Sequence, residues 1–243
     1  MHIPNGLLDP KVSAGASFAA AGVLGFCIAK VRQALSALVP ESALAGAGNI
    51  GCNMTENSKK LISTFAESHI MKMGAIASLI FAGQMFNFPI NNGTSGHLLG
   101  GVIASIALGP FSGALVIASV LAVQSIFFAD GGLMALGANI INMAVIGSLA
   151  SYYIYYLINK LIRSDEGFFA GAGIAAFLSV LLASAACSFE ISLSGTVELS
   201  RILPAMLSVH AAIGLAEALI TIMALNLLRL AGFKLEGEIK HEK

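Results

Sequence analysis

Charged residues are scarce in this chain. Only 11% of its 243 residues are Asp, Glu, Lys or Arg, whereas 57% are hydrophobic and the mean hydropathy is +0.86. Soluble domains have about 25% charged residues, so the composition excludes an ordinary soluble protein and predicts an integral membrane protein. The formal net charge is zero and the basic residues are scattered, which excludes a basic surface for nucleic acid.

Cysteine is also scarce, and the three cysteines are far apart. Cys27, Cys52 and Cys187 form no Cys-x-x-Cys pair, which argues against a zinc knuckle and against a disulfide framework. Cys27 and Cys187 lie in apolar runs, where we expect them to be packing residues.

Three sequence motifs of enzymes are absent. The chain has no Gly-x-x-x-x-Gly-Lys-Ser/Thr loop for nucleotide phosphates, no Gly-x-Ser-x-Gly and no His-Glu-x-x-His. We therefore expect a protein that is not an enzyme, and any ATP hydrolysis that drives it has to occur in a separate subunit. An intramembrane enzyme remains the less favoured alternative.

Long apolar stretches determine the predicted fold. A helix needs roughly 20 residues to cross the hydrocarbon core of a membrane. The run 97–128 is too long for one helix and is divided at Gly109-Pro110, and its first part is short enough to be packed inside the protein. The sequence predicts an all-α, polytopic membrane helix bundle of about seven transmembrane helices, at about 12–29, 71–88, 97–108, 111–128, 133–159, 167–189 and 199–230.

The remaining segments connect these helices within a single domain, residues 1–243. Residues 30–70 are predicted to be a polar connection with one short surface helix near 33–46. The second helix is expected to stop at Pro89, and residues 91–96 to form a tight loop. Residues 231–243 are predicted to be a short, solvated tail of mixed charge.

The basic residues predict how the chain is oriented. If the amino terminus lies outside, then of the 13 Lys and Arg residues only Lys11 and Arg201 face outward. Basic residues gather on the cytoplasmic side of membrane proteins, so we expect the N-terminus outside and the C-terminus in the cytoplasm. Lys11 alone is a weak start for a signal peptide, and the chain is predicted to stay in the inner (cytoplasmic) membrane as a multi-pass protein.

The first two residues can chelate a metal ion. The α-amine of Met1, the deprotonated amide nitrogen of His2 and Nδ1 of the same histidine form two fused rings in one plane. Such a tetragonal nitrogen set suits Ni(II) or Cu(II) better than Zn(II). His97 follows a predicted outer loop and is the candidate fourth ligand. The alternative is that His2 is a surface residue near a frayed terminus.

Other polar residues in the apolar segments have two open interpretations. His210 and Glu217 lie seven residues apart, on one face of the last helix, and could serve translocation or form an interhelical hydrogen bond. Gln124 and Asn139 flank the turn at Asp130, where they could orient metal ligands or bond neighbouring helices.

Several motifs together resemble the CbiM/NikM family, the metal-binding membrane components of energy-coupling-factor (ECF) transporters. The resemblance covers about residues 1–29 and 73–230. It rests on Met-His-Ile-Pro-Asn-Gly at 1–6, Gly-Thr-Ser-Gly-His-Leu-Leu-Gly-Gly at 93–101, Asp-Gly-Gly-Leu at 130–133, Leu-Gly-Ala-Asn at 136–139, Asn-Met at 142–143 and Gly-Leu-Ala-Glu-Ala-Leu-Ile-Thr at 214–221. Residue 5 is Asn where the family commonly has Asp, and residue 7 is Leu where an aromatic residue is usual.

This resemblance implies a function, a metal site and partners. It implies uptake of Ni(II) or Co(II), with binding by the Met1 amine, the amide and ring of His2, and the ring of His97. The Gly-Thr-Ser-Gly-His loop is similar to the nickel branch. The implied partners are a transmembrane coupling subunit and cytoplasmic ATPase subunits. A small accessory membrane subunit is an optional further partner.

The alternative transporter is a secondary carrier of metal driven by an ion gradient. Such carriers require several charged residues within the spans and inverted repeats. Only Glu217 with His210 meets the first requirement, so the ATP-driven importer is the favoured prediction.

Overall fold

Helices make up most of the computed structural model, which describes residues 2–37, 56–85, 87–90 and 94–238. The helices and strands, in chain order, are α1 Pro10–Ala37, α3 Glu56–Gln84, β1 Asn87–Ile90, β2 Thr94–His97, α4 Gly101–Leu108, α5 Pro110–Phe127, α6 Leu136–Ile140, the π-helix η1 Ile141–Ala150, α7 Ser151–Leu161, α8 Asp165–Leu193 and α9 Leu199–Leu230. The predicted last helix, 199–230, has the bounds of α9.

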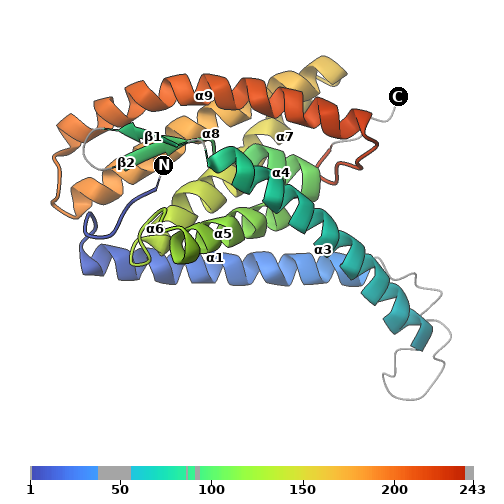
Figure 1. The fold of residues 1–243 in the computed structure, drawn as a ribbon. Coiled ribbons are helices and arrows are strands. Elements are labelled where there is room, and N and C mark those ends of the chain that lie inside the picture. Colours follow the sequence, from blue (N-terminus) through green and yellow to red (C-terminus); the bar gives the residue numbers. More distant parts are fainter. Residues whose placement is uncertain (1, 38–55, 86, 91–93, 239–243) are drawn as a thin grey trace.

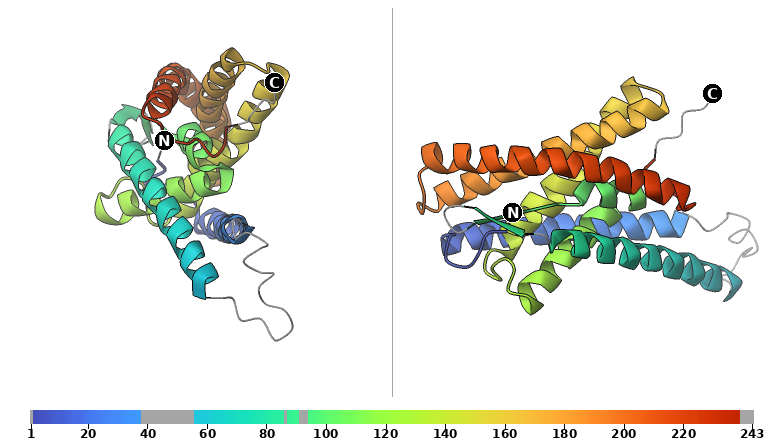
Figure 2. Two further views of the ribbon diagram at one scale, coloured as in Figure 1. Left: turned by 90° about the vertical axis from the view of Figure 1, so that its right-hand side faces the viewer. Right: turned by 45° about the horizontal axis from the view of Figure 1, so that its top comes forward.

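The long helices enclose the shorter ones. Helices α8 and α9 pack side by side along one side of the molecule, and α1 runs along the opposite side (Figure 1). Between these layers lie α4, α5, α6 and η1. Helix α3 slants across the bundle, and its first turns project beyond the other helices (Figure 2).

The helices have the length and composition of membrane spans. Five helical stretches in the described part of the chain are long and apolar enough to cross a membrane: Pro10–Ala37, Pro110–Phe127, Leu136–Leu161, Asp165–Leu193 and Leu199–Leu230. Helix α3 has 29 residues but is not among these five. Helix α4 is buried throughout, as predicted, but its eight residues rise only about 12 Å, too little to cross the membrane as a helix.

The segment before α4 differs from the prediction. Helix α3 ends at Gln84, not at Pro89, and Pro89 lies in strand β1. Strands β1 and β2 pair antiparallel, with Asn87 opposite His97, so His97 ends a strand and does not begin a helix. Proline is tolerated because a two-stranded ribbon consists of edge strands. Strands of four residues without alternating polarity gave no recognisable pattern in the sequence.

The predicted connection and tail also differ. Helix α1 continues to Ala37 and α3 begins at Glu56, so much of the predicted connection at 30–70 is helical. Residues 38–46 of the predicted surface helix lie outside the described residues. The tail is not simply solvated, because the N–H groups of Glu236 and Gly237 donate to the carbonyls of Ala107 and Ile106 at 3.1 and 2.9 Å. These bonds pair carbonyl groups at the end of α4.

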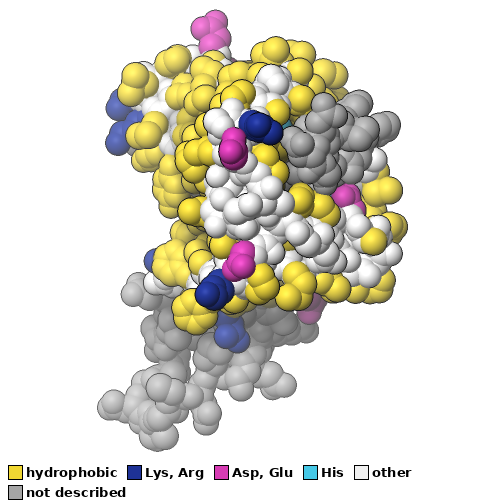
Figure 3. All heavy atoms as spheres, turned by 90° about the vertical axis from the view of Figure 1, so that its left-hand side faces the viewer, with side chains coloured by type: hydrophobic (Ala, Val, Ile, Leu, Met, Phe, Trp, Pro, Cys, Tyr) yellow, Lys and Arg dark blue, Asp and Glu magenta, His cyan; other side chains and the backbone are white. Residues whose placement is uncertain are grey.

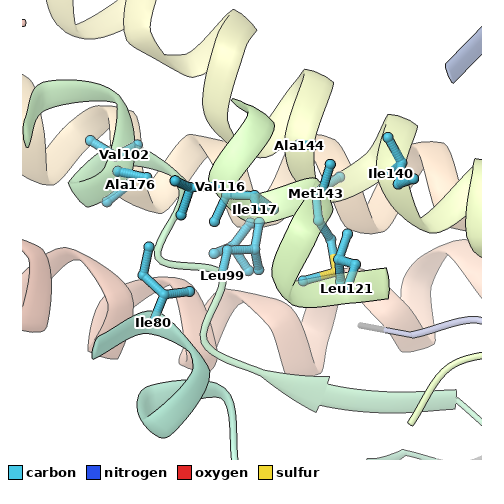
Figure 4. Close-up of a cluster of buried hydrophobic side chains, with 14 of the residues drawn as sticks. Ile80, Leu99, Val102, Val116, Ile117, Leu121, Ile140, Met143, Ala144 and Ala176 are labelled. Atoms are coloured by element: carbon cyan, nitrogen blue, oxygen red, sulfur yellow. The ribbon is translucent and has the colours of Figure 1, made fainter. Parts of the chain in front are cut away.

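Leu99 anchors the chain between β2 and α4. Its side chain is fully buried, and Figure 4 shows it beside Ile117 of α5. A Cβ atom at Gly147 would lie only 2.7 Å from Cδ2 of Leu99, so η1 packs directly against this side chain. Gly100 follows with φ +70°, a conformation that favours glycine. The backbone just after His97 is therefore held by the core.

Helices α1 and α6 approach each other closely at Gly137. A Cβ atom at Gly137 would lie 2.4 Å from Cα of Ser17. Small residues in membrane helices permit such backbone contact, and the buried Ser13 and Ala20 continue the contact face of α1. Gly74 in α3 is different, because a Cβ atom there meets nothing within 4 Å.

Gly137→Ala is expected to lower the stability of the protein by about 1–3 kcal/mol, because the added methyl group forces α1 and α6 apart. Thermal unfolding of the purified protein in detergent measures the effect. Gly74→Ala is the matched control and is expected to unfold at or above the temperature of the original protein. Equal unfolding temperatures for the two variants would contradict the close contact.

Candidate metal site

The segment that precedes α1 is inserted into the molecule. Ile3 is completely buried, and the side chain of His2 is 3% exposed. The N–H of Ile3 donates to Oδ1 of Asn139 at 2.8 Å, and its carbonyl accepts from Nδ2 of Asn139 and from the N–H of Gly132 at 3.2 and 2.9 Å. A buried backbone needs these partners. His2 is therefore not a surface residue near a frayed terminus.

Asn5 continues this attachment. Its Oδ1 accepts a hydrogen bond from the N–H of Met134 at 3.1 Å. A Cβ atom at Gly132 would lie 2.4 Å from the backbone nitrogen of Asn5, so the two segments touch along their backbones. An aspartate at position 5 could accept the same bond. The departure from the usual family residue therefore leaves this contact intact.

The fold brings the two predicted histidines together. The ring centroids of His2 and His97 lie 4.4 Å apart, at an interplanar angle of 31°. His97 is completely buried. Met1, the other predicted ligand, lies outside the described residues. Within the described part of the chain, no group of three or more His, Cys, Asp or Glu side chains is arranged to hold a metal ion.

Hydrogen bonds fix the tautomer of both rings. Nδ1 of His97 donates to the carbonyl of Leu98 at 2.7 Å, and Nδ1 of His2 donates to Oδ1 of Asp130 at 2.9 Å. The lone pair of each neutral ring is then on Nε2. Both Nε2 atoms are buried and have no hydrogen-bond partner among the described residues. An unpaired buried acceptor is costly, and a metal ion would satisfy it.

The contact between His2 and Asp130 bears on the predicted chelate. The chelate uses Nδ1 of His2, the atom that donates to Asp130 in this structure. A metal ion bound through Nδ1 would replace that hydrogen bond, and the ring would have to turn. Asp130 belongs to the Asp-Gly-Gly-Leu motif, which was the only signal in the sequence for its position beside His2.

Burial favours the neutral form of both rings. It lowers the pKa of His2, against the opposing effect of the hydrogen bond to Asp130. That hydrogen bond in turn lowers the pKa of Asp130. At neutral pH the site consists of two uncharged imidazoles beside an ionised carboxylate.

Glu217 positions the backbone that carries His97. Its carboxylate accepts from the N–H of Leu99 at 2.8 Å and from the N–H of Gly100 at 2.7 Å. Gln84 holds the same turn, because its Nε2 donates to the carbonyl of Leu99 at 2.7 Å. Helices α9 and α3 thus hold the residues that follow His97. Asn139 orients the terminal segment, as one of the two interpretations from sequence suggested. Gln124 donates to Gln84 at 3.0 Å, and its side chain also lies beside the ring of His2, so both interpretations apply to it.

His210 does not pair with Glu217. Its Nδ1 donates to the carbonyl of Met206 at 2.8 Å, within α9, and its buried Nε2 has no partner among the described residues. The shared helix face predicted from sequence is real, since both side chains are buried, but the two residues have separate contacts.

His2 and His97 lie below the surface of the nearest end of the molecule. Figure 3 views this end, where α1 begins and α8 connects to α9. Backbone and uncharged polar atoms lie at its centre, with a few charged side chains and apolar side chains around them. Histidine surface is almost absent from this view, in agreement with the burial of His2 and His97.

Comparison with protein families gives a match over nearly the whole chain. Residues 2–234 match the family described as CbiM, cobalt uptake substrate-specific transmembrane region. The chain belongs to the CbiM family. The CbiM match includes the inserted terminal segment, the hairpin with His97 and the helix with Glu217.

Relatives place the chain nearer the nickel branch of this family. A protein of Archaeoglobus fulgidus with the NikMN name is 37% identical over 223 residues, 91% of this chain and 63% of that protein. The fused nickel transport protein NikMN of Rhodobacter capsulatus is 30% identical over 236 residues, 91% of this chain and 59% of that protein. The chain thus spans about three fifths of these fused relatives.

A solved structure has the same fold. The crystal structure of a truncated transition metal transporter aligns with a TM-score of 0.76 and 25% identity, covering 96% of this chain and 100% of the other. The chain is therefore a member of a nickel and cobalt transport family, with the helical fold of a metal transporter.

Glu217→Gln is expected to weaken Ni(II) binding by about 10- to 100-fold, because an amide oxygen and NH₂ group cannot accept from both N–H groups that hold the turn after His97. Isothermal titration calorimetry of the purified protein measures the affinity. Glu190→Gln is the control, since Glu190 accepts from the side chain of Asn142 and an amide oxygen can do the same. Unchanged affinity in Glu217→Gln would show that the turn does not position His97.

Proposed function

We propose that this protein is the substrate-specific membrane component of an ATP-driven ECF importer, and that it captures Ni(II) at the outer face. Co(II) is the second candidate substrate. The observation that carries the proposal is the buried contact of His2 with His97, together with the Nε2 atom of His97, which is unpaired among the described residues. Membership of a nickel and cobalt transport family supports it.

The proposed site is square-planar and has four nitrogen ligands. These are the amine of Met1, the amide nitrogen and Nδ1 of His2, and Nε2 of His97. An ionised amide and three further nitrogens form a strong field that favours d⁸ Ni(II), and Ni(II) also lies above Co(II) in the general order of affinities. Binding by this set releases Asp130 from Nδ1 of His2. The carboxylate then remains beside the site as a negative charge.

The proposed topology has seven crossings, with the N-terminus outside and the C-terminus in the cytoplasm, in the inner membrane. The distribution of Lys and Arg residues supports this orientation. Because α4 is too short to cross as a helix, the crossing that contains it would be completed by the extended residues before it. The buried histidines then face the side from which metal arrives.

Energy for transport is proposed to come from other subunits. The sequence has no phosphate-binding loop of the Walker type, so ATP would be hydrolysed by cytoplasmic ATPase subunits and coupled through a transmembrane subunit. Ala14, Gly15 and Gly22 of α1 are exposed, and such small residues permit close helix packing. This face of α1 is a candidate docking surface for the coupling subunit.

A carrier driven by an ion gradient is the rival. Its support is the presence of His210 and Glu217 within α9. Glu217 is already bonded to two backbone N–H groups, which favours a structural role. Nickel uptake by the reconstituted chain alone, driven by an ion gradient without ATP, would favour the carrier over the importer.

Blocking the terminal amine is expected to weaken Ni(II) binding by roughly 100-fold or more, equal to about 2.7 kcal/mol. An uncleaved Gly-Ser extension ahead of Met1 converts the amine into a peptide nitrogen and keeps every side chain. Calorimetry gives the affinity, and the d–d absorption of square-planar nickel reports the geometry. The same extension after Lys243 is the control. Tight binding with unchanged absorption in the N-terminal variant would exclude the amine as a ligand.

Nickel affinity is expected to fall at least tenfold between pH 8 and pH 6.5. The amine, with a usual pKa of about 8, and the amide must lose protons to bind. Burial lowers the pKa of His2 below 6.5, so its ring is mostly neutral in this range and contributes little to the fall. Competition with a chromophoric chelator measures the affinity at each pH. Binding as tight at pH 5 as at pH 8 would rule out the amide-nitrogen model.

A further inference from the structure

A second polar site lies at the other end of α1. A pocket of about 570 Å³ opens between α1, α3, the turn from α4 to α5 and the segment after α9. Its walls include Val31 and Leu35 of α1 and Phe111 of α5, whereas Lys30, Lys72 and Lys234 contribute charge. None of these residues belongs to the histidine site.

The pocket has more positive than negative charge. Glu236 is the one carboxylate among the described residues that line it, and Lys72 already binds this group, with 3.0 Å between Nζ and Oε1. His69 also contacts Glu236, and its Nε2 lies 2.9 Å from Oγ of Ser112. Lys30 and Lys234 have no carboxylate within 4 Å in the described part of the chain. The pocket therefore has two lysines that can bind an anion.

The position along α1 places this pocket at a membrane boundary. Lys30 lies 20 residues after Pro10, the first residue of α1, and this length of helix rises about 30 Å. That distance is about the thickness of the hydrocarbon core. If the start of α1 lies at one boundary, Lys30 lies at the other, where lipid headgroups are found.

An exposed aromatic ring lies one helical turn before Lys30 on the same face of α1. Phe26 is 53% exposed. Nζ of Lys30 lies 5.6 Å from the ring centroid of Phe26, and this ring contacts Phe111 at 5.7 Å. A molecule that placed an anionic group at Lys30 could therefore lay an acyl chain along α1.

We propose that this pocket binds the phosphate headgroup of an anionic phospholipid. Lys30 and Lys234 bind the phosphate, and the first part of an acyl chain lies against Phe26, beyond the small residues Ala14, Gly15 and Gly22 of the candidate docking surface. Basic pockets between membrane helices bind anionic headgroups in this way. The lipid would bridge α1 and the segment after α9. The proposed orientation would place this lipid in the cytoplasmic leaflet, whereas the lipid site itself does not depend on metal transport.

The test is native mass spectrometry of the delipidated full-length protein with dioleoylphosphatidylglycerol or dioleoylphosphatidylcholine. The phosphatidylglycerol is expected to bind in preference. The double variant Lys30→Gln/Lys234→Gln is expected to bind it about 25-fold more weakly, since each lysine contributes about fivefold. Lys160→Gln/Arg163→Gln removes the same charge from the chain outside the pocket and is expected to retain the affinity. Nickel binding should be unchanged in both variants, so a failed lipid test leaves the metal site unaffected.

Inorganic phosphate distinguishes lipid from free anion. Phosphate at millimolar concentration is expected not to displace phosphatidylglycerol, because it gains nothing from the exposed ring of Phe26. Displacement by phosphate would overturn the lipid assignment in favour of a soluble anion. Equal binding of the two lipids, as expected if the lysines face an acidic partner protein, would overturn it as well. An equal loss of affinity for phosphatidylglycerol in Lys160→Gln/Arg163→Gln would also overturn the lipid assignment.

Discussion

Burial of His2 and Ile3 is the constraint on which the candidate metal site depends. A chain end usually frays, because its ordering costs more conformational entropy than it gains in contacts. Here Ile3 is buried and exchanges two hydrogen bonds with the side chain of Asn139, and Gly132 supplies a third. With the backbone satisfied, His2 is held inside the protein. A metal ligand of this kind needs a fixed backbone as much as the right side chain.

The two histidines are oriented by oxygen atoms from different parts of the chain. Asp130 fixes the ring of His2, and the carbonyl of Leu98 fixes that of His97. Glu217 then ties the turn after His97 to α9, a helix of 32 residues that runs the length of the molecule. The turn beside the candidate site is therefore joined to a membrane-length helix by two hydrogen bonds.

Some of this arrangement could be predicted from the sequence, and the reasons differ by element. The bounds of α9 were predicted correctly because a long apolar run in the sequence directly indicates a membrane-spanning helix. The hairpin of β1 and β2 was missed, since strands of four residues have too few positions to show a period. The packing of Glu236 and Gly237, which follow α9, was also missed. The polar residues around them suggest solvent, but their backbone N–H groups pair with carbonyls at the end of α4.

The sequence by itself determined the membrane class, the helical fold and the candidate ligands, because composition and the chemistry of an amine beside a histidine are local properties. Only the tertiary structure decided that His2 and His97 lie 4.4 Å apart, that Asp130 is bonded to the same ring, and that Glu217 serves the backbone and not His210. These contacts join residues more than 90 positions apart. They depend on how the helices pack, which no local pattern contains.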